Sequence, residues 1–97
     1  MLIRYVRMTF REDKIEEFLK IFNDSKHKIK AMNGCQHLEL MHDINHPTIF
    51  MTHSHWNSEI DLNNYRDSEL FKITWAKTKA IFADKPIAFS VESLIVV

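Results

Sequence analysis

The sequence has little glycine, proline and cysteine, and its charges cancel. One Gly and two Pro among 97 residues exclude linkers, low-complexity tails and disordered arms. The lone Cys35 excludes an internal disulfide and a cysteine-rich metal site. Thirteen basic residues against thirteen acidic ones argue against a surface for nucleic acid or for an anionic membrane. We therefore expect one compact domain over residues 1–97, with no nucleic-acid or membrane partner.

Long apolar runs are also missing. The first thirteen residues carry arginines at positions 4, 7 and 11, which leaves no unbroken apolar stretch for a signal peptide. No segment has the roughly 18 consecutive apolar residues of a membrane span. We therefore expect a cytoplasmic protein.

Hydrophobic periodicity predicts the secondary structure. Alternation with period two predicts strands over residues 2–10, 35–42, 48–56 and 87–97. Helical spacing predicts a long helix over about 13–32, a short one from about 58 to 64, and another over 68–82. Asp13 and Glu16 resemble a capping box at the start of the long helix, and Gly34 suits a left-handed turn after it.

The predicted order of elements is β-α-β-β-α(α)-β. This order predicts an α+β, ferredoxin-like βαββαβ fold, in which all helices cover one face of a four-stranded antiparallel sheet. The strands nevertheless carry apolar side chains on both faces, since Ile3 and Tyr5 lie opposite Leu2 and Val6. An uncovered apolar face needs a cover, and a second copy of the chain is the simplest one. The pattern therefore predicts a homodimer.

A spaced set of residues follows the third predicted strand and carries a family resemblance. Its members are Trp56, Ser58, Leu62, Tyr65, Ser68 and Phe71. Upstream, Gly34 and Cys35 follow the predicted long helix, and Asp43 precedes a turn that contains proline. In these positions the sequence resembles the antibiotic biosynthesis monooxygenase family over essentially its whole length.

The resemblance implies a dimeric α/β barrel, a homodimer with a small apolar pocket between each sheet and its own helices. Some members of that family oxygenate phenols or quinols without metal or flavin, because the substrate anion itself reduces oxygen. On this basis we expect no cofactor and no metal. Other members degrade haem or handle small signalling molecules, and many have no known activity.

The sequence departs from the family pattern at two positions. The family's usual His is replaced by Tyr65, which can donate a hydrogen bond but is no base near neutral pH. Trp75 stands where the haem-degrading branch has its axial His, and an indole has no lone pair for iron. That branch's Asn on the first strand is missing as well. These departures argue against haem degradation.

Five of the six histidines fall within the predicted hairpin: His37, His42, His46, His53 and His55. If residue 37 pairs with 55 and residue 39 with 53, then His37, Glu39, His53 and His55 form one patch. A register slip of one residue dissolves this patch. Three interpretations stay open: a transition-metal site, a pocket base or hydrogen-bond donor, and a polar strand face at the dimer junction. The sequence favours the last.

An oxygenase without cofactor needs a dry pocket, a base for the phenolic proton, and donors to the resulting anion. His53 and His55 are the candidate catalytic bases because imidazole titrates near neutral pH, and Tyr65 is the candidate donor. The candidate substrate-binding residues are Arg7, Phe22, Met51, Trp56, Phe71 and Trp75. The ordinary alternative is that the aromatic residues belong to the core and that Arg7 forms an ion pair.

We therefore predict a cofactor-independent monooxygenase that acts on a small aromatic or quinol-like substrate. The alternative is a non-catalytic homodimer that binds a small apolar or aromatic molecule or is purely structural, and the replacement at Tyr65 favours it. RNA-recognition domains share the strand and helix order, but residues 48–55 hold one aromatic residue and neither Lys nor Arg. RNA binding is therefore not expected.

Overall fold

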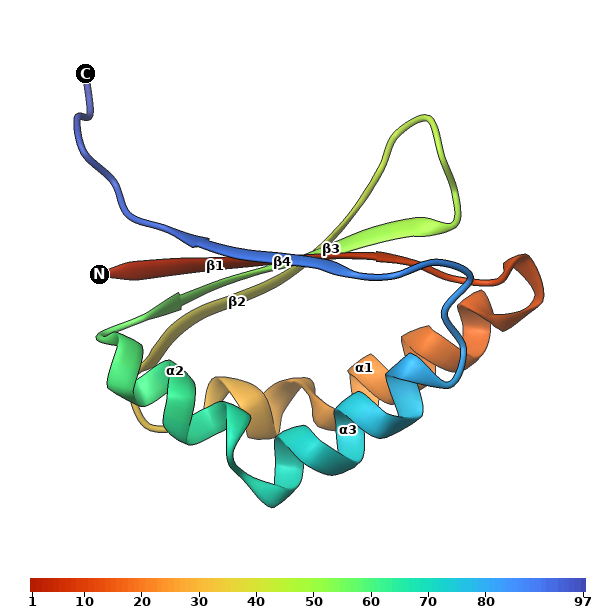
Figure 1. Ribbon diagram of the computed structural model, residues 1–97, viewed down its shortest axis with the longest axis horizontal. Helices are drawn as coiled ribbons and strands as arrows, with labels where there is room; N and C mark the ends of the chain where they lie inside the picture. The colour runs from red at the N-terminus through yellow and green to blue at the C-terminus, as the bar shows by residue number, and fades with distance from the viewer.

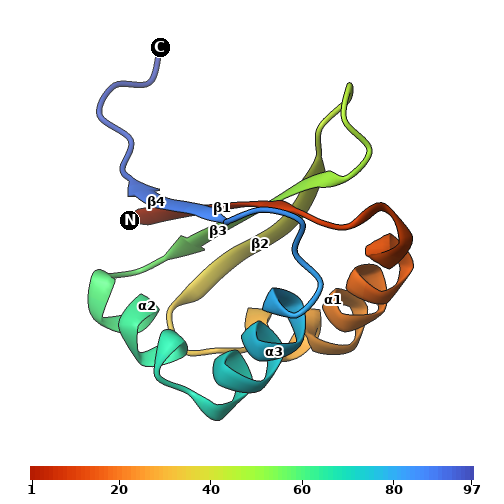
Figure 2. The ribbon, with the colours of Figure 1, turned by 45° about the vertical axis from the view of Figure 1, so that its right-hand side comes forward.

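A computed structural model describes residues 1–97 as one sheet with a layer of helices on one side. Figures 1 and 2 show all the helices below the sheet, with its other face uncovered. The predicted α+β, ferredoxin-like fold is confirmed, and no helix has the length and apolarity to cross a membrane. The elements in chain order are β1 (Leu2–Thr9), a 3-10 turn η1 (Glu12–Lys14), α1 (Ile15–Lys30), β2 (Cys35–His42), β3 (Ile49–Trp56), α2 (Glu59–Arg66), α3 (Glu69–Lys79) and β4 (Ile87–Val91).

The four strands are antiparallel and lie in the order β2-β3-β1-β4. Successive side chains of a strand leave by opposite faces of the sheet. On β1 the even-numbered residues face the helices, and Met8 keeps only 2% of its surface exposed. Tyr5 and Arg7 therefore lie on the opposite side, which we call the open face.

The helix-facing side of the sheet holds two apolar clusters. One joins the end of β1, α1, β3 and the turn after α3, and contains Met8, Phe10, Phe18, Phe50 and Ile81. The other joins β2, β3 and α2, and contains Cys35, Trp56 and Leu62. Apolar burial of this kind supplies most of the driving force for folding.

Two of the predicted helix starts are confirmed and one is wrong. The Ser58 hydroxyl accepts a hydrogen bond from the Asp61 amide at 3.2 Å, and the Ser68 hydroxyl accepts one from the Phe71 amide at 3.1 Å. These hydroxyls satisfy amide groups that the first helical turn leaves unpaired. Asp13 instead lies inside η1, and α1 begins at Ile15 without a side-chain cap. The predicted Asp13 capping box is therefore corrected.

The last strand is shorter than predicted. β4 ends at Val91, which pairs with Ile3 near the start of β1. β1 is the only neighbour of β4, so residues 92–97 have no strand to pair with inside the chain. Their apolar side chains are exposed, with Leu94 at 91% and Val96 at 86%. Figure 1 shows this tail leaving the body of the molecule.

We expect the Gly34→Ala substitution to destabilise the protein. Gly34 has a positive φ of 85°, and the Asp61 side chain occupies the space that a Cβ would need. Strain of this type costs about 1–3 kcal/mol, so urea denaturation should report that loss in the free energy of unfolding. Asn33→Ala, at an exposed neighbouring position with ordinary backbone, should change it by less than about 0.5 kcal/mol. Equal effects of the two substitutions would contradict this reading of the turn.

Candidate functional site

A cavity of about 660 Å³ lies between the sheet and the helices. All four strands contribute to its roof, β1 and β3 most of all, and α1, α2 and α3 form its floor. Its volume lies within the range of small-molecule sites, which is roughly 300–1,000 Å³. The cavity can therefore hold a ligand of one or a few rings.

A row of aromatic side chains forms one wall of the cavity. Trp56 stacks on Tyr65 with ring centroids 5.0 Å apart, and Tyr65 meets Phe71 edge-on at 5.2 Å. Phe71 in turn stacks on Trp75 at 5.8 Å. The Trp56 indole N–H donates to the Ser54 hydroxyl at 3.0 Å, so this buried donor is already satisfied. The wall offers π-surfaces to a flat apolar ligand.

Arg4 brings a positive charge to this apolar cavity. It extends from β1 among Val6 and Met8, and its Nη1 donates to the Ser90 hydroxyl at 3.1 Å. Partial burial lowers the pKa of Arg4, and repulsion from Arg66 lowers this pKa further. A guanidinium ion still keeps its proton at neutral pH. Arg66 also lines the cavity, and Asp67 is the only carboxylate that does so. The cavity therefore favours a ligand with negative charge.

Tyr65 lines the cavity with a largely buried phenol. Burial raises the pKa of its phenol well above the usual value, and the nearby Cys35 thiol adds to the rise. The hydroxyl consequently keeps its proton throughout the physiological pH range. A phenol that keeps its proton is no base near neutral pH, and the function of Tyr65 as a hydrogen-bond donor stays a prediction.

The structure separates the sequence-predicted site residues into two groups. The first group lines the cavity and consists of Phe22, Trp56, Tyr65, Phe71 and Trp75. The second group lies on the open face and consists of Arg7, Met51, His53 and His55. The expectation that both groups share one pocket is corrected, because the alternation of β1 and β3 sends their side chains through opposite faces of the sheet.

Sequence reasoning missed Arg4, although a signal for it was present. Arg4 shares its side of β1 with Leu2, Val6, Met8 and Phe10, so it is a lone charge on an apolar strand face. A charge that is partly buried among such neighbours is a candidate for function. The predicted Arg7 lies on the face that the helices leave uncovered.

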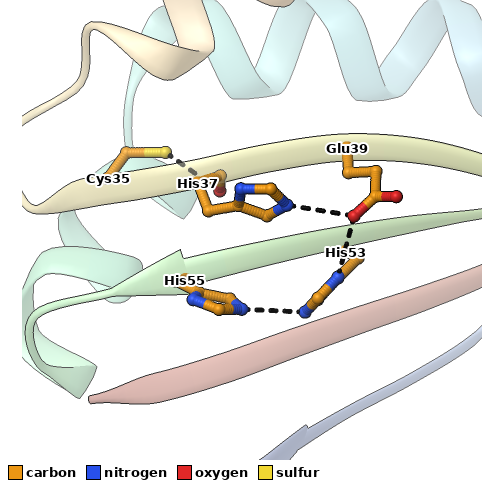
Figure 3. Close-up of polar contacts among 5 residues, drawn as sticks. All are labelled: Cys35, His37, Glu39, His53 and His55. Atoms are coloured by element: carbon orange, nitrogen blue, oxygen red, sulfur yellow. Dashed lines mark hydrogen bonds and ion pairs between the residues drawn. The ribbon is translucent and has the colours of Figure 1, made fainter.

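The histidine patch forms on the open face. His37 pairs with His55, and Glu39 pairs with His53 across β2 and β3, which is the register that the patch required. Figure 3 shows the four side chains linked in a chain of polar contacts. Hydrogen bonds from His37 first and from His53 second lower the pKa of Glu39. Burial, followed by the charges of His53 and His37, lowers the pKa of His55.

Comparisons with known proteins give a family and a shared fold. The family model described as antibiotic biosynthesis monooxygenase matches residues 1–77. A crystal structure titled as an antibiotic biosynthesis monooxygenase is similar to this chain with a TM-score of 0.92 and 16% identity, over 98% of this chain and 100% of the other. The comparison with curated proteins finds no significant match.

Two further solved structures share the fold. Rv0793 from Mycobacterium tuberculosis has a TM-score of 0.89 and 15% identity, over 98% of this chain and 96% of the other. A conserved protein from Methanosarcina mazei has a TM-score of 0.91 and 17% identity, over 97% of this chain and 94% of the other. At such identities the likeness extends to the fold and no further.

The buried Tyr65 phenol should make stability depend on alkaline pH. Because the folded-state pKa is raised, this stabilisation is complete below the unfolded pKa of about 10 and is lost as pH rises above it. The unfolding free energy of the native protein should fall relative to that of Tyr65→Phe by up to about 1.4 kcal/mol per pH unit in that range. Denaturation series at pH 8 to 11 measure the difference in unfolding free energy between the native protein and Tyr65→Phe. The other titrating groups are common to both proteins, so their effects cancel in this difference. Parallel curves would show that the phenol is not buried in solution.

Proposed function

The chain belongs to the antibiotic biosynthesis monooxygenase family, and from that premise we propose that it oxygenates a small phenol or quinol in the cavity beneath its sheet. The observation that supports this proposal most is the Arg4 guanidinium in a cavity with an aromatic wall. A neutral apolar ligand would leave that charge without an anionic partner. A phenolate or quinolate anion supplies both an aromatic ring and the negative charge.

In the proposed complex the substrate ring lies against Trp75 and Phe71, and its oxygen approaches Arg4. A cation within about 4–6 Å lowers the pKa of an acidic group by about 1–3 units. Arg4 would therefore favour the phenolate near neutral pH, and the neutral Tyr65 hydroxyl would donate a second hydrogen bond. Asp67 is exposed at the cavity wall and would pass the phenolic proton to solvent.

The proposed reaction needs oxygen as its only co-reactant. The phenolate gives electrons to O₂, one oxygen atom joins the ring carbon opposite the phenol oxygen, and the hydrogen on that carbon is lost. The second oxygen atom leaves as water, so a phenol and O₂ give a quinone and one water molecule. The aromatic wall would exclude bulk water from the reduced oxygen species.

The predicted base function of His53 and His55 does not fit a substrate held in this cavity. Both side chains lie on the open face, with the sheet between them and the aromatic wall. Their catalytic function stays a prediction that requires a substrate on the open face. In our proposal the cations of the cavity replace the imidazole base by stabilising the anion.

We also propose that a second copy of the chain covers the open face. β4 places Ile87, Phe89 and Val91 there, each between 44% and 53% exposed. The tail 92–97 continues directly from β4, carries four exposed β-forming or apolar residues, and has no partner strand within the chain. An exposed apolar face next to an unpaired strand-like tail is typical of a surface that associates with another chain.

A second candidate function is binding without turnover. It is favoured by one observation, which is that no imidazole lines the cavity. Under this alternative the protein would bind a phenolate on Arg4 and would not consume oxygen. Oxygen uptake with bound ligand distinguishes the two functions.

Substitution of Arg4 should remove the activity. With a panel of phenols and quinols, we expect Arg4→Met to lower kcat/KM for oxygen uptake by at least about a hundredfold, because one preorganised donor to an anion contributes about that much. Arg7→Met changes the same residue type on the same strand but on the open face, and it tests the sequence-based choice of arginine. Loss of activity in Arg7→Met with retention in Arg4→Met would place the substrate on the open face and refute the proposal.

The proposed dimer should be visible by sedimentation. At micromolar concentration we expect a particle of about 23 kDa, which is twice the 11.6 kDa of one chain. Phe89→Asp should release monomers because it places a charge in the covered face. Ile60→Asp changes an exposed apolar residue of α2 and should leave the dimer intact. A native particle of 11.6 kDa would exclude the proposed dimer.

A further inference from the structure

The histidine patch on the open face places three ligand atoms around a common point. His37 Nε2 lies 3.0 Å from Glu39 Oε1, and His53 Nδ1 lies 3.2 Å from the same oxygen. All three atoms lie within 4.8 Å of one another. Figure 3 shows the two rings and the carboxylate converging from β2 and β3. We propose that His37, Glu39 and His53 bind one divalent transition-metal ion.

The distances fit such an ion after small rotations of the side chains. Imidazole nitrogen and carboxylate oxygen bind Zn²⁺ at about 2.0–2.2 Å, which separates neighbouring ligands of a tetrahedron by about 3.4 Å. The two nitrogen-to-oxygen distances are already close to this separation. The paired strands hold all three side chains on one face, so the backbone needs no rearrangement.

His55 and Tyr5 would orient one of the ligands. His53 Nε2 lies 2.9 Å from His55 Nε2, and the His53 ring stacks on Tyr5 with centroids 4.8 Å apart. When Nδ1 of His53 binds the metal, its Nε2 carries the hydrogen and donates it to His55. Metal-bound histidines commonly donate their second N–H in this way, which fixes the tautomer and the ring. His55 is therefore a positioning residue in this proposal.

The rival interpretation is a set of ion pairs between histidine and Glu39. It does not explain why two imidazoles share one carboxylate oxygen while a third, from His55, contacts the His53 ring. The three ring centroids lie 4.7–5.2 Å apart, so protonation of all three rings would place like charges in contact. A metal ion bound through the lone pairs of His37 and His53 takes the place of those protons and contacts the Glu39 carboxylate as well.

The set of two imidazoles and one carboxylate defines the class of ion. Such a set binds zinc, and in other proteins it binds ferrous iron in oxygen chemistry, whereas Mg²⁺ and Ca²⁺ prefer sites made of oxygen. Three protein ligands leave at least one coordination position for water or another donor. This ion would lie on the side of the sheet away from the Arg4 cavity, so the inference does not depend on the proposed monooxygenase activity.

Calorimetric titration of the full chain with Zn²⁺ at neutral pH tests the proposal. We expect one Zn²⁺ per chain, with micromolar or tighter affinity. His37→Ala and His53→Ala should each weaken binding by more than about a hundredfold, and His55→Ala by about tenfold, as expected for a ligand and for its supporting residue. His27→Ala, on the exposed side of α1, and Cys35→Ser should bind as the native chain does.

Circular dichroism of each variant establishes that the fold is kept. The side chains of His37 and His53 are partly exposed, so their replacement by Ala is compatible with folding. Arg4→Met should bind Zn²⁺ with native affinity. Loss of the proposed activity in the Arg4 cavity is therefore distinguishable from loss of metal binding at the histidine patch. The proposal is wrong if the native chain binds Zn²⁺ no more tightly than the double variant His37→Ala/His53→Ala. It is also wrong if His27→Ala or Cys35→Ser abolishes binding while the three cluster variants retain it.

Discussion

Everything in this structure depends on the alternation of side chains along strands that have helices on one side only. Along β1, Arg4 enters the space between sheet and helices, while Arg7, three residues later, leaves by the opposite face. On β3 the same rule sends Ser54 and Trp56 inward and His53 and His55 outward. The sheet thereby separates two chemical environments that are formed by neighbouring residues of the same strands.

The two environments differ in the charge that they attract. Beneath the sheet, an aromatic wall and the Arg4 guanidinium suit an aromatic anion, and the neutral Tyr65 hydroxyl adds a donor. On the open face, imidazoles and the Glu39 carboxylate suit a cation instead. One small domain of the antibiotic biosynthesis monooxygenase family thus offers two candidate sites, one for an organic ligand and one for a metal ion, with a single sheet between them.

The order of the elements could be predicted from sequence because local signals determine it, whereas the hairpin register stayed open until the structure gave the pairing of His37 with His55. The Ser58 cap, the turn before Thr48 and the period of two each act over a few residues. The face covered by helices could not be read in this way, because β1 is apolar on both sides. For this reason Phe22, Trp56 and Phe71 were predicted to line the pocket together with Arg7 and His53, and only the first three do. The end of β4 depends on where its neighbour β1 ends, which is a tertiary property.

The methionine methyl resonances test most directly whether the sheet separates two sites. Met8 lines the cavity. Met41 and Met51 pair with each other across β2 and β3, and both lie on the open face, two residues along their strands from Glu39 and His53. In a methyl-labelled sample titrated with a phenol that binds, we predict that the Met8 resonance shifts and that those of Met41 and Met51 stay in place. A phenol that shifts Met41 and Met51 and leaves Met8 unchanged would contradict the assignment of the ligand site to the space beneath the sheet.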